Sequence, residues 1–172
     1  IERYLQLCAV NNMYVCDITE PSNYFHALRR QVKNKFRKPL IVFTPKGPLR
    51  YPEVISPVKD VISGGFKEMI DDADTDVRKV KRVLVCSGKI YWELLRKKKE
   101  DKRNDVAIIR IEQYYPFASR QWERLVIRYG KNKTWVWVQE EPKNMGAWAF
   151  IRDFLTGVEI HVASRIPSAS PA

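Results

Sequence analysis

The sequence has few side chains of the kinds that bind metal ions or act as nucleophiles. Its 172 residues include only three cysteines and two histidines, and none shows the spacing of a zinc site. These residues are Cys8, Cys16, Cys86, His26 and His161. The odd number of cysteines and their apolar neighbours argue against a disulfide framework, so we expect buried, reduced thiols and a cytoplasmic or mitochondrial-matrix protein. We expect both histidines to be structural and no residue to bind a metal ion.

Long apolar runs are also missing. No segment approaches the roughly 18 to 20 consecutive apolar residues that a membrane-spanning helix needs, and the first residues lack the order of a secretory signal. We therefore expect a soluble protein with no membrane partner. The chain begins at Ile1, inside an amphipathic segment, and ends with Ser168–Ala172. We expect both ends to be cuts in a longer protein.

The common motifs for nucleotide binding and hydrolysis are absent. The sequence has no Gly-x-Gly-x-x-Gly after a strand, no Gly-x-x-x-x-Gly-Lys-Ser/Thr, no Gly-x-Ser-x-Gly and no His-Glu-x-x-His. The turn at residues 86–89, Cys-Ser-Gly-Lys, comes where a strand meets a helix and suits a phosphate, although glycine is common at such turns for backbone geometry alone. Glu140 and Glu141 follow a strand, but adjacent carboxylates in an extended segment point to opposite sides. We therefore expect no catalytic and no cofactor-binding residue.

The net charge of +11 is distributed unevenly. Residues 1–75 carry 11 Lys/Arg against 9 Asp/Glu, whereas residues 76–172 carry 20 against 11. Much of this excess is the run Arg96–Arg103, which we interpret as the solvated end of a helix whose cations complement the helix dipole. Such charge also suggests nucleic acid. Trp135 and Trp137, however, alternate with valines in an expected buried strand instead of interleaving with cations, so we expect no nucleic-acid partner.

Apolar periodicity predicts alternating helices and strands. Helices are predicted at residues 2–10, 23–35, 88–99, 119–129 and 147–155, and strands at 13–18, 39–44, 82–86, 106–111, 134–139 and 158–162. Strands separated by such helices indicate βαβ crossovers, hence an α/β fold with a mostly parallel sheet and helices on both faces. Leu40–Phe43 is wholly apolar, which is typical of a strand buried on both faces.

The composition divides the chain into three parts. Residues 1–46 hold two strands and two helices, too little to bury an apolar strand, and are interpreted as the tail of a second α/β domain. Residues 47–77 are rich in proline and acidic side chains and are predicted to form a connector, whose apolar stretch Val58–Phe66 docks on a neighbour. Residues 78–172 are predicted to form a complete α/β domain. We expect the first part to expose apolar surface that a longer protein covers.

Cations collect on both sides of the strand predicted at 39–44. Five of them are candidates for an anion or effector site: Arg29, Arg37, Lys38, Lys46 and Arg50. A loop with this many donors can hold a phosphate or a carboxylate through charge-assisted hydrogen bonds. The alternative is that these cations only complement a helix end.

Seven segments, in chain order, carry a family resemblance: residues 1–9, 24–31, 37–46, 85–89, 106–113, 138–148 and 168–172. They include Tyr-Phe-His-Ala-Leu-Arg-Arg-Gln at 24–31 and Gln-Glu-Glu-Pro-Lys-Asn-Met-Gly-Ala-Trp at 139–148. Together they resemble the C-terminal region of the thiamine-diphosphate-dependent decarboxylase components of 2-oxoglutarate dehydrogenases, a transketolase-like family. Tyr51 stands where that family usually has histidine, so no role of that histidine is implied here.

The resemblance implies a C-terminal fragment of a homodimeric oxidoreductase of the tricarboxylic acid cycle. Such an enzyme decarboxylates 2-oxoglutarate on thiamine diphosphate with magnesium and passes the succinyl group to the lipoyl groups of an acyltransferase component. Some members respond to acetyl-CoA or AMP. Residues 1–46 would be the tail of the pyrimidine-binding domain, and residues 78–172 the transketolase-like C-terminal domain.

The family's substrate-handling histidine and its cofactor motifs precede the position of Ile1. The resemblance therefore implies that the isolated chain binds no cofactor, is inactive, and has a structural, dimerisation and regulatory role. Two alternatives stay open. One is a free-standing nucleotide- or anion-binding module that uses the five cations. The other is the 2-oxoadipate-specific relative, because most of the substrate pocket would lie upstream of this chain.

Overall fold

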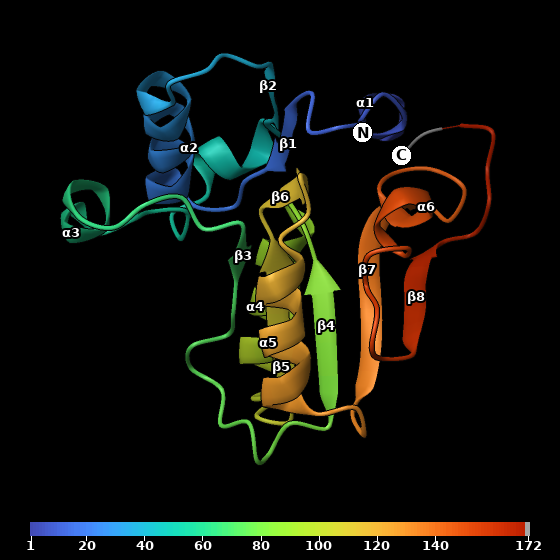
Figure 1. Cartoon of the computed structure of the whole chain (residues 1–172). Helices are drawn as coiled ribbons and strands as arrows, with labels where there is room; N and C mark the ends of the chain where they lie inside the picture. The colour runs from blue at the N-terminus through green and yellow to red at the C-terminus, as the bar shows by residue number, and fades with distance from the viewer. Residues whose placement is uncertain (171–172) are drawn as a thin grey trace.

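One continuous stretch of chain, residues 106–115, belongs to two β-sheets in the computed structural model, which describes residues 1–170 (Figure 1). The helical elements are α1 (Glu2–Gln6), α2 (Pro21–Lys33), the 3-10 helix η1 (Gly47–Arg50), α3 (Val58–Ile62), α4 (Ile90–Glu100), α5 (Ser119–Tyr129) and α6 (Trp148–Ile151). The strands are β1 (Tyr14–Asp17), β2 (Leu40–Phe43), β3 (Met69–Ile70), β4 (Arg82–Cys86), β5 (Val106–Ile111), β6 (Gln113–Tyr115), β7 (Thr134–Pro142) and β8 (Ile160–Arg165).

The larger sheet has five strands in the order β3-β5-β4-β7-β8. Strands β5, β4, β7 and β8 are parallel, and only the two-residue β3 runs antiparallel to its neighbour β5. Helices α4, α5 and α6 connect the successive parallel strands. The predicted α/β class with a mostly parallel sheet is therefore confirmed.

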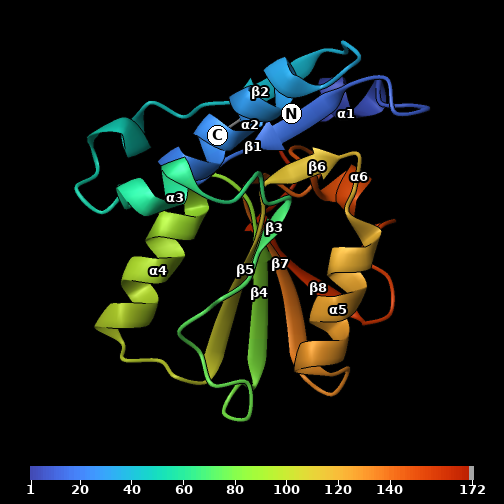
Figure 2. The same ribbon diagram turned by 60° about the vertical axis from the view of Figure 1, so that its left-hand side comes forward.

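Helices cover both faces of this sheet. Successive residues of a strand point to opposite faces, so apolar side chains on both faces need a covering layer. Val85 and Trp137 belong to the larger core cluster, which includes Trp122 of α5. Cys86, the neighbour of Val85, belongs instead to a second cluster with Leu94 of α4. Figure 2 shows α4 and α5 on opposite sides of the sheet. Each fully buried large apolar side chain contributes about 1.5 to 3 kcal/mol to folding.

The smaller sheet has the order β2-β1-β6, in which β1 is parallel to β2 and antiparallel to β6. Strand β2 lies at its edge, and all four residues of Leu40–Phe43 are only half-buried. The prediction that this strand is buried on both faces is therefore wrong for this chain. Within residues 1–170 no strand pairs with the outer edge of β2.

Helix α1 is shorter than predicted and ends at Gln6. The Asn12 side chain explains the end, because its Oδ1 accepts a hydrogen bond from the Ala9 N–H (3.1 Å) and its Nδ2 donates to the Leu7 carbonyl (2.8 Å). These bonds satisfy backbone groups that a longer helix would have paired. The predicted first helix is therefore too long by about one turn.

The predicted connector takes part in the fold. Strand β3 forms the edge of the larger sheet, and α3 contacts α2, where His26 Nε2 lies 2.8 Å from the Asp60 carbonyl. Val58 and Ile62 are nevertheless exposed, so α3 docks only in part. The division at 1–46, 47–77 and 78–172 stays a prediction, and residues 171 and 172 lie outside the described residues.

Large apolar side chains are exposed on α1, α2, α3 and the segments that follow them. Members that are more than 40% exposed include Leu7, Val10, Phe25, Leu28, Val32, Phe36, Val58 and Ile62. Those within residues 1–46 form the apolar surface that the sequence predicts for the first part of the chain, whereas Val58 and Ile62 belong to the predicted connector. Among residues 1–170 no helix combines the length and the apolar character needed to cross a membrane.

Candidate functional site

The candidate site lies at the carboxyl edge of the larger sheet. Strand β4 lies between β5 and β7, and the chain leaves β4 through α4 to reach β5 on one side, whereas β7 and β8 lie on the other. A reversal of strand order of this kind opens a crevice at the carboxyl ends of parallel strands, where α/β proteins bind ligands. The smaller sheet lies over this edge (Figure 1). The last residues of β1 and β2 therefore face the loops that follow β4 and β7.

Two neighbouring cavities occupy the crevice. The larger cavity, of about 550 Å³, is mostly apolar, with walls from Pro21, Tyr24, Leu49, Val54 and Trp92. The smaller cavity, of about 270 Å³, has more polar walls, which include Asp17, Ser87, Tyr114, Glu140 and Glu141. Thr44, Pro45 and Lys89 border both cavities. Such a pairing of apolar walls with a few polar groups is typical of small-molecule sites.

Gly88 shapes the turn between β4 and α4. Its φ of +64° lies in the left-handed region, and a Cβ atom at this position would overlap the Asp17 carboxylate. Only glycine fits there without backbone strain and without displacing the Asp17 carboxylate. The turn brings the amino end of α4, with its partly positive N–H groups, to the crevice. The sequence marks this turn as suited to a phosphate, and Gly88 and Lys89 do line the larger cavity.

Lys89 is the only cation that lines either cavity, among the described residues. Its ammonium lies 2.6 Å from a Glu140 carboxylate oxygen, and this hydrogen bond raises the pKa of Lys89. An anion in the larger cavity would therefore compete with Glu140 for Lys89. Glu141 does not share this contact, in agreement with the expectation that the two adjacent carboxylates point different ways.

Asp17, the last residue of β1, is a buried carboxylate with little hydrogen-bond support. Burial raises its pKa to about 7, and the nearby Glu112 and Glu141 carboxylates add to the rise. Among residues 1–170 the one side-chain donor to its carboxylate is the Tyr114 hydroxyl, at 3.5 Å. Asp17 therefore exchanges its proton near neutral pH, at the wall of the smaller cavity.

Glu112 is fully buried where β5 ends and β6 begins. Its carboxylate accepts hydrogen bonds from the Thr19 N–H (2.9 Å), the Thr19 hydroxyl (2.6 Å) and the Asn23 side-chain amide (3.0 Å). Burial raises the pKa of Glu112, and the charge of Arg110 and these hydrogen bonds oppose the rise. Two of these donors come from the segment that joins β1 to α2, and the third comes from the first turn of α2. Glu112 therefore ties the smaller sheet to the larger one beside the cavities.

Arg110 extends this buried network. Its Nη1 donates to the Thr19 hydroxyl (3.0 Å) and to a Glu20 carboxylate oxygen (2.6 Å), and its guanidinium lies 4.2 Å from the centre of the Tyr91 ring. The Arg110–Glu20 pair is mostly shielded from water on the arginine side, so its geometry is well defined. These contacts fix the positions of Thr19 and Glu20, which line the larger cavity.

Gln139 shapes the other wall and gave no signal in the sequence. Its Oε1 accepts hydrogen bonds from Trp137 Nε1 (2.9 Å) and from the Trp148 N–H (3.1 Å), and its Nε2 donates to the Pro142 and Met145 carbonyls. A single side-chain amide thereby provides hydrogen-bond partners for several backbone groups of the turn between β7 and α6. Only the three-dimensional contacts distinguish Gln139 from other glutamines of the chain.

The cysteines of the chain supply no reactive group to the site. Burial raises the pKa of Cys16 to about 12 and raises that of Cys86 as well, so both stay protonated thiols. All three cysteines are free, and Cys8 is half-buried, which corrects the prediction that it is buried. The arrangement is therefore suited to binding and not to nucleophilic chemistry.

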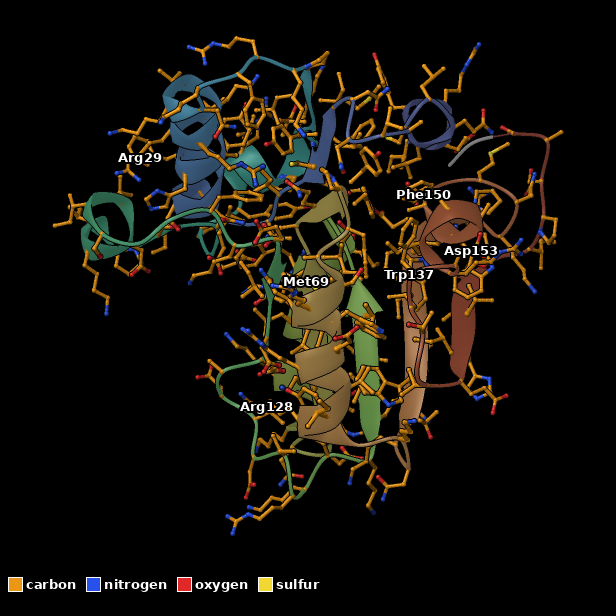
Figure 3. All side chains as sticks on the ribbon, in the orientation of Figure 1. Arg29, Met69, Arg128, Trp137, Phe150 and Asp153 are labelled. Atoms are coloured by element: carbon orange, nitrogen blue, oxygen red, sulfur yellow. The ribbon has the colours of Figure 1, made fainter. Side chains whose placement is uncertain are left out.

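The five cations predicted to hold an anion lie in three places. Arg29 is exposed on the outer side of α2, away from Trp137 of β7 (Figure 3). Arg37 and Lys38 precede β2, whereas Lys46 and Arg50 follow it. The four residues of β2 span roughly 13 Å, so the two pairs lie at opposite ends of this strand. Of the five, Lys46 and Arg50 flank residues that line the larger cavity.

Two of these cations are held by their own chain. The Lys38 ammonium donates to the Asn11 carbonyl at 3.0 Å and lies 4.0 Å from the centre of the Tyr14 ring. Arg37 donates to the Asn34 carbonyl. These contacts show how Arg37 and Lys38 stabilise the loop before β2 without a ligand.

The donor set does not fit a magnesium diphosphate. Among residues 1–170 no three His, Cys, Asp or Glu side chains come together at distances suited to a metal ion. The carboxylates of the smaller cavity face a single lysine, which Glu140 already neutralises. No step of a reaction is therefore assigned to a bound metal or cofactor in this chain.

Comparison with known proteins places the chain among components of one enzyme. Residues 55–172 match the family described as "2-oxoglutarate dehydrogenase C-terminal". The whole chain is 44% identical to the 2-oxoglutarate dehydrogenase E1 component of Cupriavidus necator and 44% identical to that of Haemophilus influenzae. Over 86% of the chain, it is 49% identical to the E1 component of Coxiella burnetii. The chain spans 16 to 19% of the length of these relatives.

Replacement of Asp17 tests the electrostatics of the smaller cavity. Because the folded protein holds the Asp17 proton more tightly than the unfolded chain, stability from this group is full below pH 4 and is lost as the pH rises to about 7. Asp17→Asn should remove this loss and raise the free energy of unfolding at pH 8 by about 1 to 3 kcal/mol. Urea unfolding between pH 4 and pH 8 measures the effect. Exposed Asp153→Asn is the control, and a pH profile of Asp17→Asn parallel to that of the parent would contradict the assignment.

Proposed function

The chain belongs to the 2-oxoglutarate dehydrogenase C-terminal family, and from this membership we propose that it is the C-terminal part of a thiamine-diphosphate-dependent E1 component. The parent protein decarboxylates 2-oxoglutarate and transfers the succinyl group to lipoyl groups, in the tricarboxylic acid cycle. The observation that carries this proposal is identity of 43 to 49% to E1 components across nearly the whole chain. Similarity at this level covers both sheets and both cavities.

The chain contributes structure and regulation to the parent, not its catalytic groups. In support, the described residues offer no metal-binding group, the cysteine thiols are protonated, and the one cavity-lining lysine is paired with Glu140. Thiamine diphosphate and magnesium then bind to parts of the parent outside these residues. The proposed compartment is the cytoplasm in bacteria or the mitochondrial matrix elsewhere.

The proposed partners are a second copy of the parent and the lipoyl acyltransferase component of the complex. The exposed apolar side chains of α1 and α2, such as Leu7 and Val32, support a covered position of the first part in the parent. The 2-oxoadipate-specific relative stays the alternative for the substrate, because most of the substrate pocket would lie in parts of the parent outside this chain.

An effector site for acetyl-CoA or AMP is proposed at the larger cavity. Lys89 lines this cavity, and Lys46 and Arg50 each follow one of its lining residues in the chain. The amino end of α4 opens into the cavity, and its apolar walls suit a flat ring. The indole N–H of Trp92, in the same wall, is buried without a hydrogen-bond partner among the described residues. Arg29, Arg37 and Lys38 do not line this cavity. A contribution of these three cations to an effector site stays a separate proposal.

Activity measurements test the proposed division of labour. Purified residues 1–172 should bind no thiamine diphosphate with magnesium and should not reduce ferricyanide in the presence of 2-oxoglutarate. The parent protein that contains them should do both, with a higher kcat/KM for 2-oxoglutarate than for 2-oxoadipate. Turnover by the isolated chain that a substitution in this chain abolishes would contradict the proposal, and a preference for 2-oxoadipate would establish the alternative.

Substitutions of two lysines test the effector site in the parent enzyme. Lys46→Ala should weaken activation by AMP or acetyl-CoA about tenfold, because one charge-assisted hydrogen bond contributes about 1.5 to 3 kcal/mol. Lys38→Ala, which removes a cation held by Asn11, should shift the activation curve less than about twofold. Activation curves at constant substrate give the comparison. If the Lys46→Ala curve superimposes on that of the parent, the site at the larger cavity is wrong.

A further inference from the structure

The amino-terminal ends of three neighbouring strands collect positive charge at the edge of the larger sheet opposite the cavities. Strands β5, β4 and β7 are adjacent and parallel, so they begin at the same edge. Three loops lie there, at residues 78–82, 101–105 and 131–134. Their contact is direct, because the Lys81 N–H donates to the Asp105 carbonyl (2.8 Å) and the Thr134 N–H donates to the Lys81 carbonyl (3.0 Å). Figure 1 shows this edge at the end of the molecule farthest from α1 and α2.

The anionic side chains of these loops are already paired with other cations. Arg103 binds both oxygens of Asp105, at 2.6 and 2.9 Å, and Lys97 binds Asp101 at 2.9 Å. The run Arg96–Arg103, which dominates the charge of the sequence, is therefore largely neutralised within the chain, since Arg96 and Lys98 also pair with carboxylates. Six cations of the three loops have no ion pair within residues 1–170. One of them, Lys79, lies near the Asp76 carboxylate and lowers its pKa, so we leave it out and consider the other five. We call these five the basic edge: Lys81, Arg82, Lys102, Lys131 and Lys133.

The five charges act together. Neighbouring strands lie about 4.8 Å apart, which is less than the Debye length of about 8 Å at physiological salt, so the fields of cations at adjacent strand ends add. The register supports this proximity, because Arg82 lies beside both Val106 and Thr134. Four of the five side chains are exposed, and Lys133 is half-buried. An uncompensated field of one sign attracts a partner of opposite charge and speeds its association.

We propose that the basic edge docks an acidic polypeptide surface. Three features favour a polypeptide over nucleic acid or an anionic membrane. The loops contain no aromatic side chain on which a base could stack. The guanidinium of Arg103, whose planar fork suits a phosphate, is bound by Asp105, which leaves mainly lysines as point charges. Val80 is fully buried, so no large exposed apolar side chain of these loops is available to enter a membrane.

Two quadruple variants of the full 172-residue chain separate this surface from net charge. The edge variant carries Lys81→Gln, Lys102→Gln, Lys131→Gln and Lys133→Gln. The control variant carries Lys33→Gln, Lys35→Gln, Lys59→Gln and Lys67→Gln, four exposed lysines far from the basic edge that change the net charge by the same amount. All eight side chains lack ion pairs within the described residues, so each variant should keep the far-UV circular dichroism spectrum of the parent.

The probe is a fluorescent peptide of about 20 residues rich in Asp and Glu, titrated at about 50 mM salt. The edge variant should bind it at least tenfold more weakly than the parent, with a shallower salt dependence, and the control variant should change the dissociation constant less than twofold. If either variant is misfolded, the doubles Lys131→Gln/Lys133→Gln and Lys33→Gln/Lys35→Gln give the same comparison in smaller steps.

The competing occupants are tested with a single-stranded oligonucleotide of equal charge and with vesicles that contain phosphatidylserine. Tighter binding of either one, lost in the edge variant, would replace the acidic polypeptide as the partner and overturn the proposal. If both variants bind the peptide equally weakly, net charge explains the binding and the proposal is wrong. Absence of peptide binding by the parent chain would overturn the proposal outright.

Discussion

The buried carboxylate of Glu112 determines how the two sheets meet. The chain turns at this residue from β5 into β6, its carbonyl accepts the Asp17 N–H at 3.0 Å, and its side chain binds Thr19 and Asn23. A buried charge that loses its partners destabilises a protein by about 3 to 5 kcal/mol, against a total stability of about 5 to 15 kcal/mol for a domain. The segment between β1 and α2 therefore has one favourable position over the larger sheet.

The cavities are a consequence of that position. With β1 held by Glu112, Asp17 is pressed against Gly88, where a side chain would not fit, and both lie beside the loops that follow β4 and β7. The smaller sheet covers part of the crevice of the larger sheet, and both cavities stay partly open to solvent. A ligand that enters the crevice would touch residues from both sheets at once.

The elements that the sequence predicts best are those whose signal is local. Helix α5 and strand β5 have the predicted bounds, because α5 has a clear amphipathic periodicity and β5 is an apolar run interrupted only by Arg110. Strand β6 was missed because it has three residues and exists only through its pairing with β1, about 100 residues away. Asp17, Glu112 and Gln139 were missed for the same reason, since their roles depend on contacts that spacing does not reveal. The turn at Gly88 and Lys89 could be recognised in the sequence because a glycine between a strand and a helix has a local cause, and its binding of an anion stays a prediction.

Native-state hydrogen exchange of the backbone amides tests most directly whether Glu112 holds the two sheets together. If Glu112 unites the two sheets, the amides of Asp17 and Thr19, which donate to its carbonyl and its carboxylate, open only with the core. Their opening free energies should then lie within about 1 kcal/mol of those of the β5 amides, such as that of Ile109. Glu112→Ala should lower all of them together. Opening free energies of Asp17 and Thr19 several kcal/mol below that of Ile109 would show that the smaller sheet detaches on its own, and would contradict the account.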